Sequence, residues 1–463
     1  MPRAAEGWRS GMRALTTRAC APRVTTLASH DAAALLRALH DTLSAWKVGS
    51  AQTLLFSLSK SLPRDVLADA VGLLHSKQRT SSSVGFLSAP LPPSLVQSAK
   101  LPHAISLAAL SDAVPFRSTI PGAQRIAVGR VLGRQPGKPN ARAERLGDND
   151  WRTLWGKENI DLSIPPALAT GRAPGAVLFA SDAQPQGLLE GLDAHFPHAS
   201  VLGTVTAPTP FETGRDHTLF YSTPTAHEIC GEGAVGVALY GNARIERCYE
   251  ALVPVGERML VTGAKGNILS SLDHGNATQQ FLRMAVQNHG ARTREMGDAQ
   301  VRDLSSQVRK EDEYFVGLYD AAHGSDTDVA PALIGRIVSG HPVRGTLCIE
   351  THAELGHGVQ AGSSARFYAQ FFRLASPAEH TPAQMPAAPR TPRCVFLTYP
   401  ADGGLAIAPD PACMGAFKTH AITEFPNVFF SVSDREWIAR SGGAPHGTLA
   451  GAVPYARATL YSL

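Results

Sequence analysis

Two separate stretches of the chain share one order of apolar and polar positions. The first, from Thr53, reads TLLFSLSKSLPRDVLADAVGLLHSKQRTSSSVGFLSAPLP, and the second, from Ala176, reads AVLFASDAQPQGLLEGLDAHFPHASVLGTVTAPTP. Each begins with an apolar run, passes through a turn with serine and proline into apolar positions at helical spacing, and closes on a short apolar run before Ala-Pro. This order predicts a strand, a helix that starts near the proline, and a second strand. The alternative is chance similarity between two ordinary β-α-β units, because this unit is common in α/β proteins.

The rest of the chain reads mainly as strands. Apolar and polar residues alternate in HTLFY, VGVALYG, RIERCYEALVPV and ERMLVTG, which predicts consecutive antiparallel strands. A further strand pair is expected in GTLCIETHAEL and SSARFYAQFFRLA, and single strands in CVFLTYP, NVFFSVSD and ATLYSL. Helical spacing predicts helices over residues 28–43, capped by Ser29 or Asp31, around Gln279–Gln287 and near Met414–His420. The predicted fold class is therefore α/β, with mixed sheets and repeated strand-helix-strand units.

Length and composition bear on the number of domains. A chain of 463 residues is too long for a single domain, because domains hold roughly 150 residues each. Apolar residues make up 44% of the chain and charged residues 18%, which indicates a folded protein. We expect two halves, residues 28–278 with a basic insertion near 120–159, and residues 279–463 with a Pro/Ala-rich loop near 375–393.

The N-terminal residues 1–27 have the character of a targeting segment. Their first two dozen positions hold one acid, Glu6, against five arginines at Arg3, Arg9, Arg13, Arg18 and Arg23. Arginines interleaved with apolar residues can form a basic amphipathic helix, the kind of segment that mitochondrial import recognises. We expect a mitochondrial matrix protein whose leader lies outside the fold, with the first apolar strand at Thr53. The alternative is an ordinary basic tail on a cytoplasmic protein.

Several classes of protein lack their sequence signals. No run approaches the roughly 18 uncharged apolar residues of a membrane helix. The net charge of +4 is spread along the chain without a basic, aromatic-rich stripe, so no nucleic-acid partner is expected. The six cysteines form no C-x-x-C pair, and His352 and His357 in ETHAELGHG are spaced as in a surface turn, so no metal is expected.

One glycine-rich stretch has the spacing of a dinucleotide-binding loop. GEGAVG, from Gly231, matches G-x-G-x-x-G, but such a loop must open a helix, whereas the residues after it alternate as in a strand. No dinucleotide or other cofactor is therefore expected. Cys230, which follows His227 and Glu228, is expected to be a buried structural cysteine, with a reactive thiol as the alternative.

The residues from Val235 to Thr278 resemble the core of FIST-domain proteins. The matching elements are Gly256, Val261-Thr262, Gly266-Asn267, Leu272-Asp273 and Ala277, with Gly358, Val359, Gly362 and SSARFYAQFFR for the family's C-terminal half. Asp273 is expected to cap the helix that follows it. The resemblance implies a FIST N-like half and a FIST C-like half in a stand-alone eukaryotic member. Gly203-Thr204-Val205-Thr206 and Gly451-Ala452-Val453-Pro454 depart from polar turns of the family.

The resemblance implies a sensory, non-catalytic domain that binds a small molecule such as an amino acid. A protein-interaction adapter, as in F-box ubiquitin-ligase subunits that carry this domain, is the first alternative, and a cysteine-dependent enzyme is the second. Loops at the carboxyl ends of strands present ligand-binding groups in α/β sheets. The expected ligand-binding residues are Ser57, Ser59, Ser181, Asp182, Thr204 and Thr206.

Overall fold

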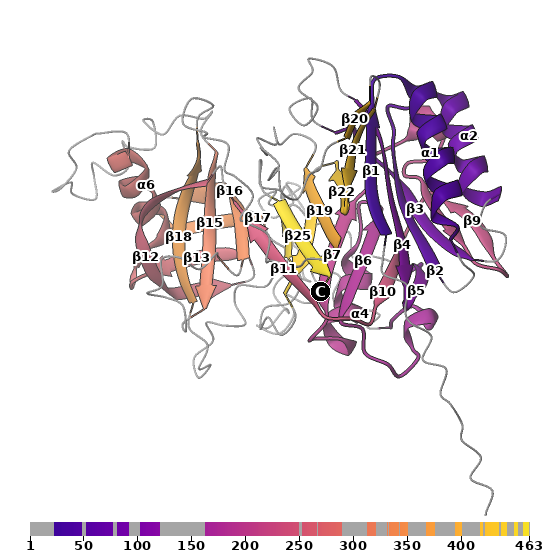
Figure 1. The fold of residues 1–463 in the computed structure, drawn as a ribbon. Helices are drawn as coiled ribbons and strands as arrows, with labels where there is room; N and C mark the ends of the chain where they lie inside the picture. Colours follow the sequence, from indigo (N-terminus) through magenta and orange to yellow (C-terminus); the bar gives the residue numbers. More distant parts are fainter. Residues whose placement is uncertain are drawn as a thin grey trace, which may run out of the picture.

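The structure is a computed structural model, and the ribbon is drawn in Figure 1. The residues that it describes are 23–48, 52–76, 81–91, 102–120, 163–249, 252–265, 267–288, 313–320, 331, 333–341, 343–350, 367–375, 394–400, 417–419, 422–434, 437–441, 449–451 and 457–462. The expectations for residues 1–22, for the basic insertion, for the Pro/Ala-rich loop, and for His352 and His357 fall outside these residues.

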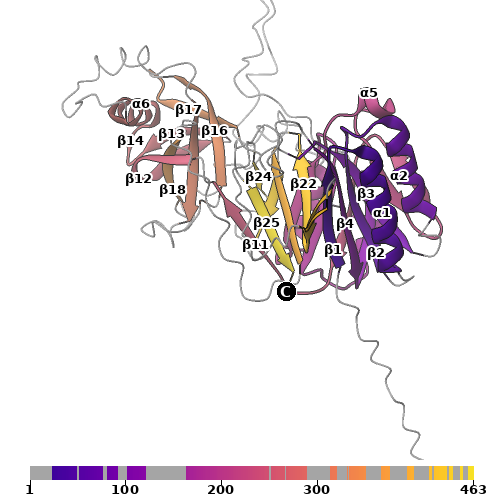
Figure 2. The same ribbon diagram turned by 45° about the horizontal axis from the view of Figure 1, so that its top comes forward.

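The first sheet has eight strands and carries two helices on its outer face (Figures 1 and 2). In spatial order its strands are β20 (Phe417–Thr419), β21 (Ile422–Pro426), β1 (Arg23–Ser29), β4 (His103–Ser111), β2 (Gln52–Ser59), β3 (Ser82–Ser88), β8 (Leu219–Ser222) and β9 (His227–Cys230). The helices are α1 (Ala32–Trp46), whose N-cap is Asp31, and α2 (Arg64–Ser76). Alternate residues of β2 explain the two layers, because Leu54 and Phe56 pack on the helices while Leu55 faces the opposite side.

The second sheet has six strands and faces the first. Its spatial order is β24 (Leu449–Gly451), β23 (Trp437–Arg440), β7 (Ser200–Val205), β6 (Ala176–Ser181), β10 (Ala234–Leu239) and β5 (Ala113–Ser118). Val177 and Phe179 pack on α4 (Gln186–His195) and the short helix η3 (Pro166–Leu168). Two sheets therefore lie between two helical layers.

The two repeated units predicted from the sequence are present, one in each of these sheets. β2 and β3, joined by α2, are parallel, and so are β6 and β7, joined by α4. In both units a phenylalanine of the first strand lies opposite a glycine of the second: Phe56 opposite Gly85, and Phe179 opposite Gly203. The absence of a side chain at each glycine leaves room for the aromatic ring.

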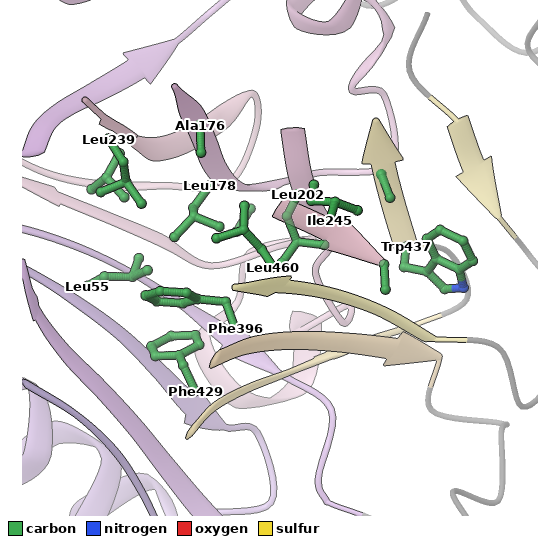
Figure 3. Close-up of a cluster of buried hydrophobic side chains, with 14 of the residues drawn as sticks. Leu55, Ala176, Leu178, Leu202, Leu239, Ile245, Phe396, Phe429, Trp437 and Leu460 are labelled. Carbon is green, nitrogen blue, oxygen red and sulfur yellow. The ribbon is translucent and has the colours of Figure 1, made fainter. Parts of the chain in front are cut away.

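A third sheet of four strands completes the core between the first two. Its order is β11 (Ala243–Cys248), β25 (Arg457–Ser462), β19 (Cys394–Pro400) and β22 (Val428–Ser433). Figure 3 shows side chains of the three sheets in one apolar cluster, with Leu55 of the first, Leu178 and Leu202 of the second, and Phe396 and Phe429 of the third. Residues from both ends of the chain thus share one core.

The remaining strands form a separate barrel on the side away from α1 and α2 (Figure 1). Its strands are β12 (Leu252–Lys265), β18 (Phe367–Leu374), β15 (Tyr314–Asp320), β16 (Leu333–His341), β17 (Thr346–Glu350) and β13 (Ile268–Leu272), with the two-residue β14 (Gly275–Asn276) beside β13. The barrel closes because β12 pairs with both β18 and β13. The helix α6 (Ala277–Asn288) packs against it through Phe281, whose ring lies 5.0 Å from that of Tyr314.

The expectation that residues 1–27 lie outside the fold is wrong at its C-terminal end. Residues 23–27 belong to β1, which lies between β21 and β4, and the residues from Val24 to Ser29 are all buried. The first strand is therefore β1 and not the strand at Thr53. The sequence RVTTLAS has no apolar periodicity that would indicate a buried strand, yet its Thr26 is 0% exposed, and the Thr26 hydroxyl bonds to that of Ser106 at 2.8 Å.

The expected division at residue 278 does not separate the sheets. Residue 278 lies in α6, and the strands β12 and β13 before it belong to the same barrel as β15–β18 after it. The strands from β19 onward return to the N-terminal sheets, since β21 pairs with β1 and β23 with β7. Pairing between strands that are far apart in the sequence sets this arrangement, and local sequence patterns do not predict such pairing.

Three local expectations also need correction. Residues 417–419 form β20 rather than a helix, and β17 and β18 are both strands but do not pair with each other. Asp273 does not cap α6, because its carboxylate accepts a hydrogen bond from the Leu260 N–H at 2.8 Å. Asn276 takes the capping role, accepting from the Gln279 N–H at 2.9 Å.

Candidate functional site

The carboxyl ends of the two repeated units meet at one edge of the molecule. The Ala89 N–H, just after β3, donates to the Val432 carbonyl of β22 at 3.2 Å, and the Asp434 N–H donates to the Val205 carbonyl of β7 at 3.1 Å. The end of β22 thus joins the ends of β3 and β7. We call this region the carboxyl edge, and define it as residues 29–31, 59–64, 88–91, 181–185 and 206–218, with His103 at the start of β4.

A loop of residues 206–218 links the two sheets along this edge. It contains the short helix α5 (Pro210–Thr213), visible beside α1 and α2 in Figure 2, and leads from β7 into β8. Lys60 Nζ donates to the Pro208 carbonyl at 3.4 Å, and the Arg64 guanidinium donates to the Phe211 carbonyl. Inside the loop, the Thr218 hydroxyl lies 2.6 Å from that of Thr209. These bonds fix the loop on the first sheet.

Ser59 and two residues that sequence reasoning missed form a chain of hydrogen bonds at the end of β2. The Ser59 and Ser61 hydroxyls are 2.7 Å apart, and Ser61 Oγ lies 2.9 Å from His103 Nδ1. Ser59 is fully buried, whereas Ser61 and His103 are half-buried. The chain therefore leads from the interior toward solvent.

The environment of His103 keeps its imidazole neutral. Burial lowers its pKa below the ordinary value, and the neighbouring His30 lowers the pKa further because two positive charges repel each other. Register explains this proximity, since His103 pairs with Ser29, the last residue of β1. A neutral imidazole offers one nitrogen as a hydrogen-bond acceptor near neutral pH.

The end of the second unit has a similar pair, Thr206 and His217. Thr206 Oγ1 lies 3.0 Å from His217 Nδ1 and donates to the Ser181 carbonyl at 3.0 Å. The Ser181 hydroxyl donates to the Asp182 carbonyl, also at 3.0 Å. The Asp182 carboxylate accepts from the Gly233 N–H at 2.7 Å, so it holds the turn that precedes β10. His217 and Asp182 are half-buried, while Thr206 and Ser181 are buried.

Two of the six expected ligand-binding residues lie inside the protein. Ser57 donates to the Ser88 hydroxyl at 2.9 Å, and the Thr204 hydroxyl lies 2.6 Å from that of Thr398. Both side chains are almost completely buried between sheets, at 3% and 2% exposure. The structure therefore brings Ser59, Ser181, Asp182 and Thr206 to the carboxyl edge and places Ser57 and Thr204 behind it.

Sequence reasoning missed Ser61, His103 and His217 because their contacts are not local. His103 lies 42 positions after Ser61, at the start of a strand rather than at its end. The one available signal was the third serine in SLSKS, two positions after Ser59 at the turn into the helix. Histidine at strand starts carries no comparable pattern.

The other candidate motifs have structural roles. The GEGAVG stretch leads into a strand, as predicted, because β10 begins at Ala234 within it, and Gly233 has a positive φ of 82° in the turn before this strand. Burial raises the pKa of the Cys230 thiol, with Arg117 opposing the effect, so the thiol stays protonated near neutral pH. This protonation disfavours a nucleophilic role for Cys230.

The described residues also bear on metal binding and on membrane insertion. The described part of the chain holds no group of three or more His, Cys, Asp or Glu side chains placed to bind a metal ion. None of the described helices combines the length and apolar composition that a membrane span requires.

Comparison with known families supports the resemblance noted in the sequence. Residues 81–275 match the family model described as the FIST N domain. The match begins at the start of β3 and ends at β14, so it includes the unit β6–α4–β7 and both edge histidines, His103 and His217. Ser57, Ser59 and Ser61 precede it. A search of the curated proteins found no match.

Proposed function

We propose that this chain, whose residues 81–275 match the FIST N domain, is a sensor that binds a small molecule at the carboxyl edge. The observation that supports this site most is the meeting of both repeated units at that edge, through the bonds from Ala89 and Asp434 to their partner strands. In α/β proteins, ligands bind outside the carboxyl ends of strands. We further propose that the FIST C-like half includes the barrel.

The chemistry of the edge suits a small polar ligand such as an amino acid or a related metabolite. Ser61, His103 and His217 are half-buried groups that can donate or accept hydrogen bonds, and Lys60 and Arg64 supply positive charge close to Ser61. Asp182 supplies negative charge at the end of the second unit. A zwitterionic ligand needs groups of both signs, and partial burial strengthens each contact relative to one in water.

A thermal-shift screen of amino acids and small metabolites tests this proposal. A ligand present at about 100 times its Kd is expected to stabilise the native state by about 2.7 kcal/mol. His103→Gln and His217→Gln should reduce the shift because each removes an imidazole from the edge. His198→Gln is the matched control, since His198 is exposed and lies outside the edge. Stabilisation by none of the compounds, or shifts unchanged in both edge variants, would contradict the proposal.

We also propose that the N-terminal segment directs the protein to the mitochondrial matrix. Five arginines against one acid support the proposal. The burial of β1 adds a condition, because removal of a leader must end before Arg23 to leave this strand intact.

A fluorescent fusion of residues 1–30 tests the targeting proposal. The fusion is expected to enter mitochondria, and changing Arg9, Arg13 and Arg18 to Glu is expected to keep it in the cytosol, because import recognises the positive charge. N-terminal sequencing of the imported full chain should give a start at or before Arg23. An unaltered fusion that stays cytosolic would refute the targeting role.

A further inference from the structure

The hydrogen bonds around Ser61 indicate which partner accepts the proton of its hydroxyl group. Ser59 is fully buried, and among the described residues its hydroxyl bonds to Ser61 alone. A buried hydroxyl uses its proton in a hydrogen bond, so Ser59 donates to Ser61 Oγ. The Ser61 proton then goes to its other partner, His103 Nδ1, at 2.9 Å. His103 accepts at Nδ1 and carries its own proton on Nε2.

The similar pair in the second unit shows why this direction matters. The Thr206 hydroxyl donates its proton to the Ser181 carbonyl, so His217 must donate from Nδ1 to Thr206. Thr206 is also fully buried. His217 therefore does not accept a proton from Thr206, whereas His103 is placed to take the proton of Ser61, and Ser61 is half-buried rather than fully buried.

Ser61 also lies in a turn next to a helix N-terminus, a position that suits a nucleophile. It follows β2 and precedes α2, in a turn from strand to helix. The Leu67 N–H donates to the Pro63 carbonyl at 2.8 Å, so Pro63 is the N-cap residue, and its ring offers no hydrogen-bond acceptor to the N–H groups of the first turn. These groups, at the positive end of the helix dipole, can stabilise an oxyanion that forms near Ser61.

We propose that Ser61 is a nucleophile, with His103 as its general base, for acyl transfer from small carboxylic esters. Ser61 Oγ forms a bond to the ester carbonyl carbon while its proton passes to His103 Nδ1. The bond from carbon to the leaving oxygen then breaks, and the leaving alcohol takes the proton from His103. Water attacks the acylated Ser61 and gives a proton to His103, and this proton returns to Ser61 as the acid leaves. Ser59 is a positioning residue that orients the Ser61 hydroxyl.

A fluorophosphonate probe tests the proposal on the full chain. Ser61 Oγ is expected to bond to the phosphorus with loss of fluoride, and mass spectrometry should place the adduct on the peptide that contains Ser61. Ser61→Ala should abolish the adduct, and His103→Gln should lower the labelling rate by about 10²–10⁴-fold, because removal of a general base has effects of that size. Ser59→Ala should lower the rate less. Ser76→Ala is the matched control, since Ser76 is exposed at the end of α2, and this variant should label like the unaltered protein.

The dependence of labelling on pH separates a general base from a structural histidine. The rate should fall only when His103 becomes protonated, which requires a pH below the ordinary histidine value of about 6.5, since the pKa of His103 is lowered. Circular dichroism of each variant verifies folding. An adduct absent from Ser61 in folded protein, or one that forms equally fast in His103→Gln, would overturn the proposal. Neither result would contradict the proposal that the carboxyl edge binds a small molecule, because the thermal-shift screen tests that proposal separately.

Discussion

Arg440→Met is expected to lower the free energy of unfolding by about 3 kcal/mol, the lower end of the range for removing one partner of a buried ion pair. The Arg440 side chain is 1% exposed, on β23 of the C-terminal segment, and its guanidinium bonds to Asp193 of α4. It also donates to the Phe196 carbonyl at 2.6 Å and to the Ala199 carbonyl at 3.0 Å. Methionine fills a similar volume but donates no hydrogen bond to these acceptors, so the Phe196 carbonyl keeps only its bond from the Ala199 N–H at 3.1 Å. Asp193 is 31% exposed, so water can solvate it in part, and this limits the loss.

Denaturant unfolding of the variant measures this loss, and a second ion pair supplies the control. Arg172 makes two bonds of 2.7 Å to Asp112, but both side chains are more than half exposed. Arg172→Met should therefore lower the free energy of unfolding much less than Arg440→Met does, because solvent screens an exposed ion pair. Arg440→Lys should fall between, since lysine keeps the charge without the planar fork. Equal losses for Arg440→Met and Arg172→Met would show that burial does not increase the contribution of the Arg440 contacts to the free energy of unfolding.

Gly203→Ala is expected to lower the free energy of unfolding by about 1–3 kcal/mol, the cost of overpacking a core. A Cβ at Gly203 would lie 2.4 Å from the Phe179 ring, and a Cβ at Gly85 would lie 2.2 Å from that of Phe56. Neither ring has free space, because Phe179 is 5% exposed and Phe56 is not exposed. The same result is expected for Gly85→Ala, because the two repeated units share this pair.

A double-mutant cycle with Phe179→Leu identifies the cause. If the ring is the obstacle, Gly203→Ala should cost less in the Phe179→Leu background than in the unaltered chain. Gly72→Ala on α2 is the control, since a Cβ there meets nothing within 4 Å, and alanine is expected to stabilise the helix. Additive losses for Gly203→Ala and Phe179→Leu would contradict the steric explanation.

Sequence patterns located the repeated units because each depends on neighbouring residues alone. An apolar run, a proline near a helix start and a short apolar run before Ala-Pro are readable within about forty positions, and β2–α2–β3 and β6–α4–β7 are present as predicted. The same local pattern predicted that Ser59, Ser181, Asp182 and Thr206 lie at the carboxyl ends of strands, and the structure places all of them at the carboxyl edge. It did not place Ser57 and Thr204, because period 2 along a strand does not tell which face another sheet covers.

The sequence by itself determined the secondary structure of the repeated units, the strand into which GEGAVG leads and the family to which residues 81–275 are similar. Tertiary structure alone decided that β1 is buried, that the C-terminal strands complete the N-terminal sheets, and that Ser61 meets His103. The physical reason is the range of the interactions. Helical and strand periodicity arises from backbone geometry between neighbours, whereas a pairing such as Arg440 with Asp193, 247 positions apart, forms only when the packing of sheets brings distant segments together.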